Sequence, residues 1–148
     1  MFDENKLEFK TIPYDRQIIN DLEVLKKTTF ANLGNGIIYE PEVFDAKSMT
    51  GLMATYDGEV VAGCFVCNQE PILYISSLFV KNEYQRCGYH IGKQILLKTL
   101  QQKVEFEKYY EKQFHLARMY ALNEKLRNLY LSWGFEAPYD SLLVQKAL

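Results

Sequence analysis

The chain has 148 residues, of which 48% are hydrophobic and 24% are charged, and its formal net charge is −2. This length favours one domain, residues 1–148, with a substantial buried core. The mixed charges argue against nucleic-acid binding as the main role. No apolar run approaches the ~20 residues that a membrane span needs. The acidic N-terminus resembles neither a signal peptide nor a transit peptide, so we expect no membrane contact and a cytoplasmic location.

The three cysteines are Cys64, Cys67 and Cys87. Cys64 and Cys67 have the spacing of a redox motif, but they lie in an apolar, strand-like run rather than at a helix start, where a thiol pKa is lowered. We therefore expect both to be reduced packing residues. The chain has only two histidines and no Cys/His cluster, so no metal site is predicted.

Residues 7–12 alternate apolar and polar side chains, which predicts a half-buried strand. Asp15 is a suitable N-cap for a helix over 16–30. Its apolar face is predicted to comprise Ile18, Ile19, Leu22, Leu25 and Thr29. The segment 33–50 contains turn residues and a proline, which indicates a loop with a short helix.

The middle of the chain favours a hairpin whose turn is Asp57-Gly58, followed by a strand over 72–80. Apolar residues then recur at helical spacing and predict a helix over 91–103. The apolar residues of this helix are Ile91, Ile95, Leu96, Leu100 and Val104.

Residues 114–122 resemble another strand, and Asn123 can cap a following helix over 124–133. Gly134 is well placed to end that helix, and residues 141–148 form a last strand. The predicted core stripe of the helix is Leu126, Leu129, Tyr130 and Trp133. The resulting order of strands and helices indicates an α/β architecture, a mixed sheet covered by helices.

The segment 73–100 reads as a strand, a polar turn containing glycine, and a helix. The first N–H groups of a helix have no partner within it, and the helix dipole makes this end attractive to anions. A turn with glycine lets backbone N–H groups approach a phosphate closely. This order therefore predicts a site for a phosphate-bearing cofactor.

Two motifs resemble the GNAT superfamily of acyl-CoA-dependent N-acyltransferases. The first is Leu78-Phe79-Val80 followed by Gln85-x-x-Gly88, which is similar to the family's fourth strand and pyrophosphate loop. The next glycine of that pattern falls on His90, whereas the helix that follows fits better if Gly92 is the closing glycine. An insertion around Tyr89 and His90 would reconcile the two alignments.

The second motif is Asn123-x-x-Leu126-x-x-x-Tyr130-x-x-x-Gly134-Phe135, in which Leu126 replaces the usual alanine. The resemblance implies a mostly antiparallel central sheet, flanked by helices, with a splayed strand pair that holds acetyl-CoA as co-substrate. It also implies Tyr130 as the acid that protonates the leaving thiolate. The implied cofactor-binding residues are Leu78, Phe79, Val80, Gln85, Arg86, Cys87, Gly88, Tyr89, His90, Ile91, Gly92, Lys93, Asn123 and Tyr130.

Each of these roles has a plainer alternative. Tyr130 lies on the stripe of a helix and can be a core aromatic residue, and Asn123 can act only as a helix cap. The general base is open as well, because residues 74–77 include no carboxylate and Glu70 precedes the strand. A water held by Ser76 or Tyr74 could relay the proton.

The acceptor site is expected among residues 30–45 and the hairpin loops. The stretch 39–45 is acidic and aromatic, which suits a cationic amine but also an ordinary solvated loop.

The sequence thus predicts an N-acetyltransferase that moves an acetyl group from acetyl-CoA to a primary amine of a small molecule or peptide, by direct transfer in a ternary complex. One alternative is a non-catalytic acyl-CoA-binding sensor or partner subunit. Another is an interaction protein without cofactor binding. A dinucleotide-binding domain is disfavoured, because no G-x-G-x-x-G follows the first strand. Relatives in the family are often dimers, which leaves a homodimer open.

Overall fold

The computed structural model describes residues 2–13, 15–31, 49–85 and 88–148. Its sheet has the strand order β1-β2-β3-β4-β5-β6, so every strand lies beside its neighbour in sequence. All neighbouring pairs are antiparallel except β4 and β5, which are parallel. The strands are β1 (Leu7–Thr11), β2 (Met49–Tyr56), β3 (Glu59–Gln69), β4 (Ile72–Val80), β5 (Leu116–Tyr120) and β6 (Leu143–Ala147).

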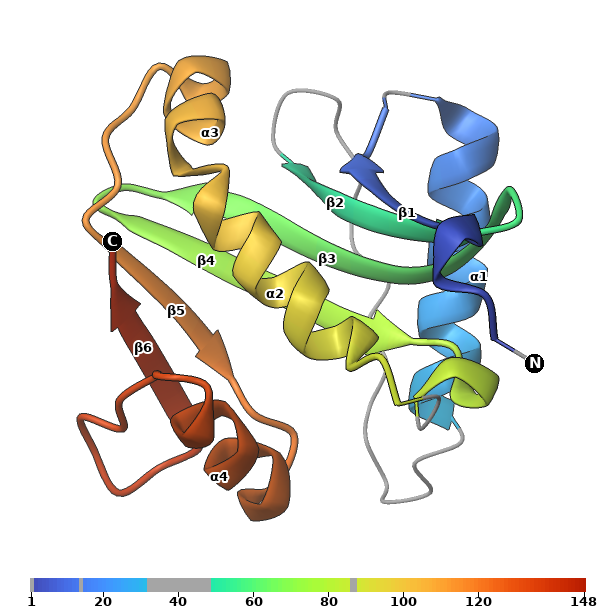
Figure 1. The fold of residues 1–148 in the computed structure, drawn as a ribbon. Coiled ribbons are helices and arrows are strands. Elements are labelled where there is room, and N and C mark those ends of the chain that lie inside the picture. The colour runs from blue at the N-terminus through green and yellow to red at the C-terminus, as the bar shows by residue number, and fades with distance from the viewer. Residues whose placement is uncertain (1, 14, 32–48, 86–87) are drawn as a thin grey trace.

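The helices are α1 (Arg16–Ala31), α2 (Ile91–Gln101), α3 (Lys103–Tyr110) and α4 (Glu124–Ser132), with short 3₁₀ turns η1 (Glu4–Lys6) and η2 (Asn82–Tyr84). Helix α2 runs obliquely across the front of the sheet in Figure 1, while α1 lies behind it. Helix α4 lies beside β6, at the other end of the sheet from α1. The mixed, mostly antiparallel sheet flanked by helices confirms the predicted fold class.

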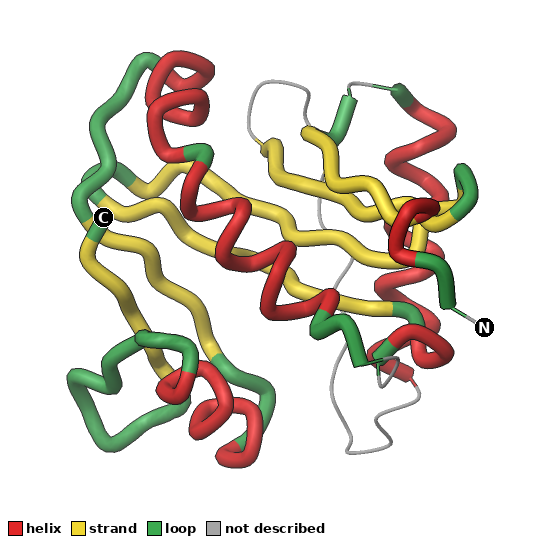
Figure 2. Tube along the Cα trace, viewed as in Figure 1, coloured by secondary structure: helices red, strands yellow, loops and turns green. Residues whose placement is uncertain are grey.

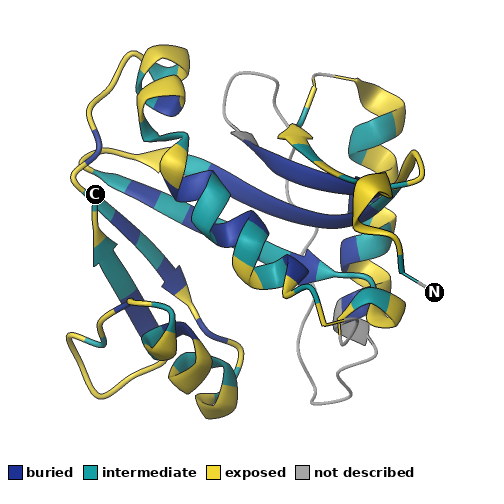
Figure 3. Ribbon diagram, viewed as in Figure 1, coloured by how far each residue is buried: buried dark blue, intermediate teal, exposed yellow. Residues whose placement is uncertain are grey.

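The core divides between the two faces of the sheet. The larger cluster lies under α2 and includes Ile91, Ile95 and Leu96, and the smaller one lies under α1 and includes Leu22 and Phe79. Figure 3 shows the buried residues concentrated in the central strands and in the inner surface of α2.

Gly63 explains how α1 comes so close to the sheet. A Cβ at this position would lie 2.4 Å from Cζ of Phe79. The bare backbone therefore makes room for the Phe79 ring beneath Leu22.

The local sequence signals are reproduced closely. The carboxylate of Asp15 accepts hydrogen bonds from the backbone N–H of Gln17 and Ile18, and thus caps α1. Asp57 and Gly58 both have positive φ, as the two central residues of a tight hairpin turn require.

Three local expectations need correction. Helix α2 ends at Gln101 rather than near 103, and the chain turns there into α3. Val104, expected on the apolar face, is 56% exposed because it belongs to α3. Leu129 is 41% exposed, since this part of α4 borders a cavity instead of the core.

Neither of the two described cysteines is in a disulfide, and Cys64 is buried while Cys67 is half-buried. Within the described ranges, no group of three His, Cys, Asp or Glu could hold a metal ion. No helix among the described residues is long and apolar enough to cross a membrane. Most of the predicted loop (33–50) and acceptor segment (30–45) falls on residues 32–48, outside the described residues, as do Arg86 and Cys87. Residues 30–31 belong to α1, and residues 49–50 are the first of β2 rather than loop.

Candidate active site between diverging strands

The sheet opens into a gap between its two central parallel strands. Residues 72–74 of β4 pair with residues 116–118 of β5, and the pairing stops there. Strand β4 continues to Val80, whereas Met119 and Tyr120 pair only with β6. Figure 2 shows the two strands moving apart along their length. The splayed strand pair that the sequence predicted is therefore confirmed.

The second half of β4 presents free backbone groups to this gap. The N–H of Lys81 donates to the carbonyl of Val61, 2.8 Å away, so the backbone of Lys81 faces β3. Because backbone groups alternate between the two sides of an antiparallel strand, those of Val80 and Leu78 face the gap. The Val80 carbonyl already accepts a hydrogen bond of 2.8 Å from the side-chain amide of Gln85.

A bulge marks the place where the strands part. Phe65 pairs with Ser77 and the next residue of β3, Val66, pairs with Ile75, so Ser76 has no register partner in β3. Its hydroxyl donates a hydrogen bond of 3.4 Å to the carbonyl of Phe65. Such an extra residue bends the strand and increases its twist, and bulges are common beside active sites. The Ser76 side chain borders the gap.

The gap holds a cavity of about 520 Å³. One wall is formed by β4 and the start of α2, and the other by β5 and α4. The lining residues are Thr29, Ile75, Ser76, Ser77, Leu78, Phe79, Val80, Gln85, His90, Ile91, Gly92, Lys93, Met119, Tyr120, Leu122, Leu126, Leu129, Tyr130 and Trp133. Most of these side chains are apolar, and Gln85, His90 and Lys93 are the polar ones in the loop before α2 and at the start of that helix.

That loop has the backbone that close approach to an anion requires. Gly88 has φ = +88°, and a Cβ added to it would have no atom within 4 Å. Glycine is therefore favoured here by the backbone conformation and not by a lack of space. His90 has φ = +51°, in the left-handed region, directly before the first residue of α2. The N–H of Gln94 donates to the His90 carbonyl. The N–H groups of residues 91–93 therefore have no partner within the helix.

The conformation of His90 decides between the two alignments of the loop. His90 occupies the second glycine position of the Gln85-x-x-Gly88 pattern and has the backbone for which glycine is suited. Gly92 lies inside α2, and a Cβ there would make an ordinary contact of 3.5 Å with Val80. The left-handed turn thus follows the first alignment, with histidine in place of glycine.

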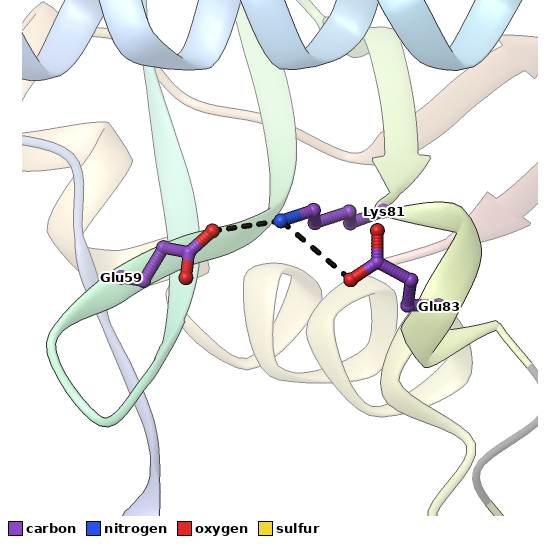
Figure 4. Close-up of polar contacts among 3 residues, drawn as sticks. All are labelled: Glu59, Lys81 and Glu83. Carbon is purple, nitrogen blue, oxygen red and sulfur yellow. Dashed lines mark hydrogen bonds and ion pairs between the residues drawn. The ribbon is translucent and has the colours of Figure 1, made fainter.

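The start of the loop is tied to the β2–β3 hairpin. Figure 4 shows the Lys81 ammonium between two carboxylates, 2.7 Å from Oε1 of Glu59 and 3.8 Å from Oε2 of Glu83. The hydrogen bond to Glu59 is the main cause that raises the pKa of Lys81. Lys81 is thereby occupied with anchoring η2, and Lys93 is the described lysine that lines the cavity.

Tyr130 on α4 lines the cavity. It is only 6% exposed, and its ring contacts Trp133 and Phe135. Burial, with a smaller effect of the nearby Cys64 thiol, raises the pKa of Tyr130 to about 12. The hydroxyl therefore stays protonated at neutral pH, and within the described part of the chain it makes no hydrogen bond, so it can donate one to a ligand.

Asn123 serves as the N-cap of α4. Its side-chain oxygen accepts a hydrogen bond of 2.8 Å from the backbone N–H of Leu126. The predicted role of Asn123 as a helix cap is thus present. Asn123, Gly88 and Tyr89 do not line the cavity themselves, although each adjoins residues that do or lies in the loop at its mouth.

No described residue that lines the cavity is a carboxylate. Glu70 lies at the far end of β4, where its Oε2 accepts a hydrogen bond of 3.3 Å from the backbone N–H of Gln113. Glu70 is not among the residues that line the cavity, whereas Ser76, one of the two residues predicted to hold a water, is.

Sequence reasoning missed much of the second wall. The sequence indicated only a strand for Met119, Tyr120 and Leu122. In the structure Tyr120 is 59% exposed, which is unusual for an aromatic residue of a strand. Their place in the cavity follows from the early end of the β4–β5 pairing, which no local pattern reveals.

Comparison with known proteins agrees with this geometry. The sequence matches the Acetyltransferase (GNAT) family over residues 19–135. A comparison with curated proteins found no match.

Many solved structures share the fold at low sequence identity. The PaiA N-acetyltransferase of Thermoplasma acidophilum, crystallised in complex with coenzyme A, is 16% identical with a TM-score of 0.69, covering 95% of this chain and 99% of that one. A GNAT-family acetyltransferase of Staphylococcus aureus Mu50 is 14% identical with a TM-score of 0.72, over 95% and 99% of the two chains.

A third similar structure is the aminoglycoside acetyltransferase meta-AAC0020 from an uncultured soil sample, crystallised with trehalose. It is 19% identical with a TM-score of 0.66, and the match covers 93% of both chains. The family match covers more than half of the sequence, and the strand order, the splayed strands and the loop before α2 fit it: the chain belongs to the GNAT family of acetyltransferases.

Proposed function

We propose that this protein is an N-acetyltransferase that moves the acetyl group of acetyl-CoA to a primary amine, of a small molecule or a peptide, in a ternary complex. The observation that carries the proposal is the cavity between β4 and β5. It is lined on one wall by the start of α2, with the loop before it, and on the other by the buried, protonated Tyr130. A similar structure contains coenzyme A, which supports a ligand of this type.

The residues of the cavity suit the parts of an acyl-CoA. The free N–H groups at the start of α2 and the ammonium of Lys93 would bind the diphosphate. The apolar walls would cover the pantetheine chain, and the backbone of Leu78 and Val80 would pair with its amides as a further strand does. The thioester supplies an activated acetyl group with a thiolate as leaving group.

Two positions then serve the transfer. A backbone N–H of β4 near Val80 would stabilise the oxyanion that forms when the amine attacks. The Tyr130 hydroxyl would donate its proton to the departing sulfur, for which an acid that stays protonated throughout the neutral range is suitable.

The amine must lose a proton, and we propose that a water held by Ser76 takes it. Support comes from the absence of a carboxylate among the described lining residues and from the position of Ser76 at the bulge. The variant Glu70→Gln should then leave unchanged the acidic limb of the pH–rate profile, where a general base becomes protonated. If Glu70→Gln removed that limb of the profile, Glu70 itself would be the general base and the proposed water relay would be wrong.

A non-catalytic acyl-CoA-binding role is the second candidate. The same lack of a carboxylate favours it, and so does His90 in place of a glycine. The two candidates bind the same ligand and differ only in turnover.

The deciding experiment is calorimetric titration with acetyl-CoA, followed by a screen of amine acceptors for release of free thiol. Micromolar binding with amine-dependent thiol release supports the enzyme, and binding without release for polyamines, amino acids, aminoglycosides and peptides supports the sensor. Absence of binding would reject both.

A further inference from the structure

Four aromatic rings form a cluster beside the loop that precedes α2. The cluster consists of Phe2, Tyr56 at the end of β2, Tyr84 in η2, and Tyr89 in the loop itself. The Phe2 ring lies at its centre, with ring centroids 4.8 Å from Tyr56, 6.2 Å from Tyr84 and 4.4 Å from Tyr89. Tyr56 and Tyr84 also contact each other at 5.4 Å. All four rings are half-buried and pack against the main core.

Phe2 is held there by its own segment. The backbone N–H of Asp3 donates to the hydroxyl of Tyr56 at 2.9 Å. The Asp3 carboxylate caps η1, and the N–H of Asp57 donates to the carbonyl of Lys6. The N-terminal segment is therefore fixed to the β2–β3 hairpin, and its first described side chain reaches across to the loop.

Phe2 contacts the loop at Tyr89, next to the residue that determines the loop's backbone direction. Tyr89 directly precedes His90, the left-handed residue that turns the chain into α2. The side-chain amide of Gln94 donates a short hydrogen bond to the Tyr89 carbonyl. Tyr89 is thus held by α2 through a hydrogen bond to its backbone and by Phe2 through a ring contact. The position of Tyr89 therefore determines the direction of the free N–H groups that follow it.

We propose that Phe2 is a positioning residue for the phosphate-binding loop. It does not touch the ligand, but it holds Tyr89, and through Tyr89 the left-handed turn, in the conformation that receives the diphosphate of acyl-CoA. Such preorganisation raises affinity because less ordering is left to occur on binding. The inference rests on the proposed function, since it assumes that the loop binds the cofactor.

The first test is calorimetric titration of the variant Phe2→Ala with acetyl-CoA. Loss of the ring contacts should weaken binding by roughly threefold to tenfold, the effect of one aromatic interaction. The matched control is Phe9→Ala, which removes the same ring from β1, where Phe9 packs under Lys98 and not against the loop. That variant should keep the affinity of the unmodified protein, and Phe2→Tyr should restore most of what Phe2→Ala loses.

Steady-state kinetics separate positioning from a general loss of structure. Phe2→Ala should raise KM for acetyl-CoA in proportion to the loss of affinity, with kcat and KM for the acceptor unchanged. If kcat of Phe2→Ala fell while all KM values stayed unchanged, the variant would simply contain fewer folded molecules. That result would contradict the inference.

Hydrogen exchange on the unmodified protein provides a test that needs no variant. By linkage, if Phe2 favours cofactor binding, the cofactor favours the docked N-terminal segment by the same factor. Acetyl-CoA should therefore slow exchange at the amides of Asp3 and Lys6, which are hydrogen-bonded in the docked segment.

The outcomes distinguish the two proposals. If the unmodified protein does not bind acetyl-CoA, the proposed function fails and this inference fails with it. If the protein binds acetyl-CoA, but Phe2→Ala binds equally well or the N-terminal amides exchange at the same rate in both states, the positioning role alone is wrong.

Discussion

Tyr130 is the residue on which the proposed reaction depends most. The residue lines the cavity, and its ring contacts Trp133 and Phe135. The variant Tyr130→Phe keeps the packing and removes only the acid, so we expect kcat to fall by about 100-fold, within the range for a lost general acid. KM for acetyl-CoA should change little. Thiol-release kinetics measure both, with Tyr139→Phe on the surface as the control. An unchanged kcat would return Tyr130 to a purely structural role.

The burial of Tyr130 and Cys64 also predicts how stability depends on pH. The folded state raises the pKa of both groups to about 12, from ordinary values of 10.0 and 9.0. Above the ordinary values the unfolded chain releases protons that the folded chain retains. The stabilisation is therefore complete below pH 9.0 and is lost as the pH rises toward 12.

Each group should contribute a slope on the order of 1.4 kcal/mol per pH unit within its window. Urea unfolding between about pH 8 and pH 11 measures this slope. It should be shallower in Tyr130→Phe and unchanged in Tyr139→Phe, where the tyrosine is 66% exposed. Equal slopes in all three proteins would show that Tyr130 ionises as freely in the folded state as in the unfolded one.

His90 carries a backbone conformation that most side chains avoid at a cost of about 1–2 kcal/mol. Histidine is among the residues that tolerate it best. In His90→Gly, relief of strain is offset by about 0.5–1 kcal/mol of unfolded-state entropy, so stability should hardly change. His90→Val should lose more than about 1 kcal/mol, because β-branched residues fit this region poorly.

The contrasting control is Gly92→Ala, inside α2, where a Cβ meets only an ordinary contact. That variant should be neutral or more stable by up to about 1 kcal/mol. Urea unfolding ranks the three variants. A His90→Val protein as stable as the original would show that the left-handed turn is not under strain.

At the scale of the helices, Asn123 separates capping from ligand contact. Asn123→Ala should cost about 1 kcal/mol, whereas Asn123→Ser keeps a capping oxygen and should remain as stable as the original. Acetyl-CoA titration of the stable Ser variant then isolates any role of the amide in binding. Weaker binding would add a cofactor contact to the cap, and full stability of Asn123→Ala would rule out the capping role.

The helices and strands themselves were largely readable from the sequence. Caps and turn residues such as Asp15, Asp57 and Gly134 act over a few neighbouring positions, and the structure has them where they were expected. The end of α2 was misplaced by two residues, because an apolar period continues through Val104 into α3. Local patterns cannot show where one helix yields to the next when both are amphipathic.

The candidate site was only half readable. The β4 wall and the loop follow each other in sequence, so a motif could indicate them together. The second motif likewise indicated Tyr130 of α4. The β5 residues of the opposite wall line the cavity because pairing between β4 and β5 stops after Tyr74. That end of pairing depends on the bulge at Ser76 and on the whole sheet, and therefore on contacts that no local window contains.

For the molecule as a whole, filling the cavity should stabilise the fold. A ligand present at 100 times its Kd adds about 2.7 kcal/mol, so acetyl-CoA should raise Tm measurably. The single tryptophan, Trp133, lines the cavity, and its fluorescence should change over the same concentration range. Acetyl-pantetheine, which lacks the diphosphate, is the control and should give a smaller shift at equal concentration. Equal shifts would mean that the loop before α2 contributes nothing.

The short pairing between β4 and β5 has a consequence for the life of the protein in a cell. Among the described residues, only 72–74 of β4 pair with β5, and we expect a partial opening of the fold to begin at this short seam between the two strands. A bound cofactor would span the seam and close it. Proteases act on opened states, and we therefore expect the empty protein to be degraded faster than the loaded one. The abundance of this enzyme would then follow the supply of acetyl-CoA, without any separate regulator.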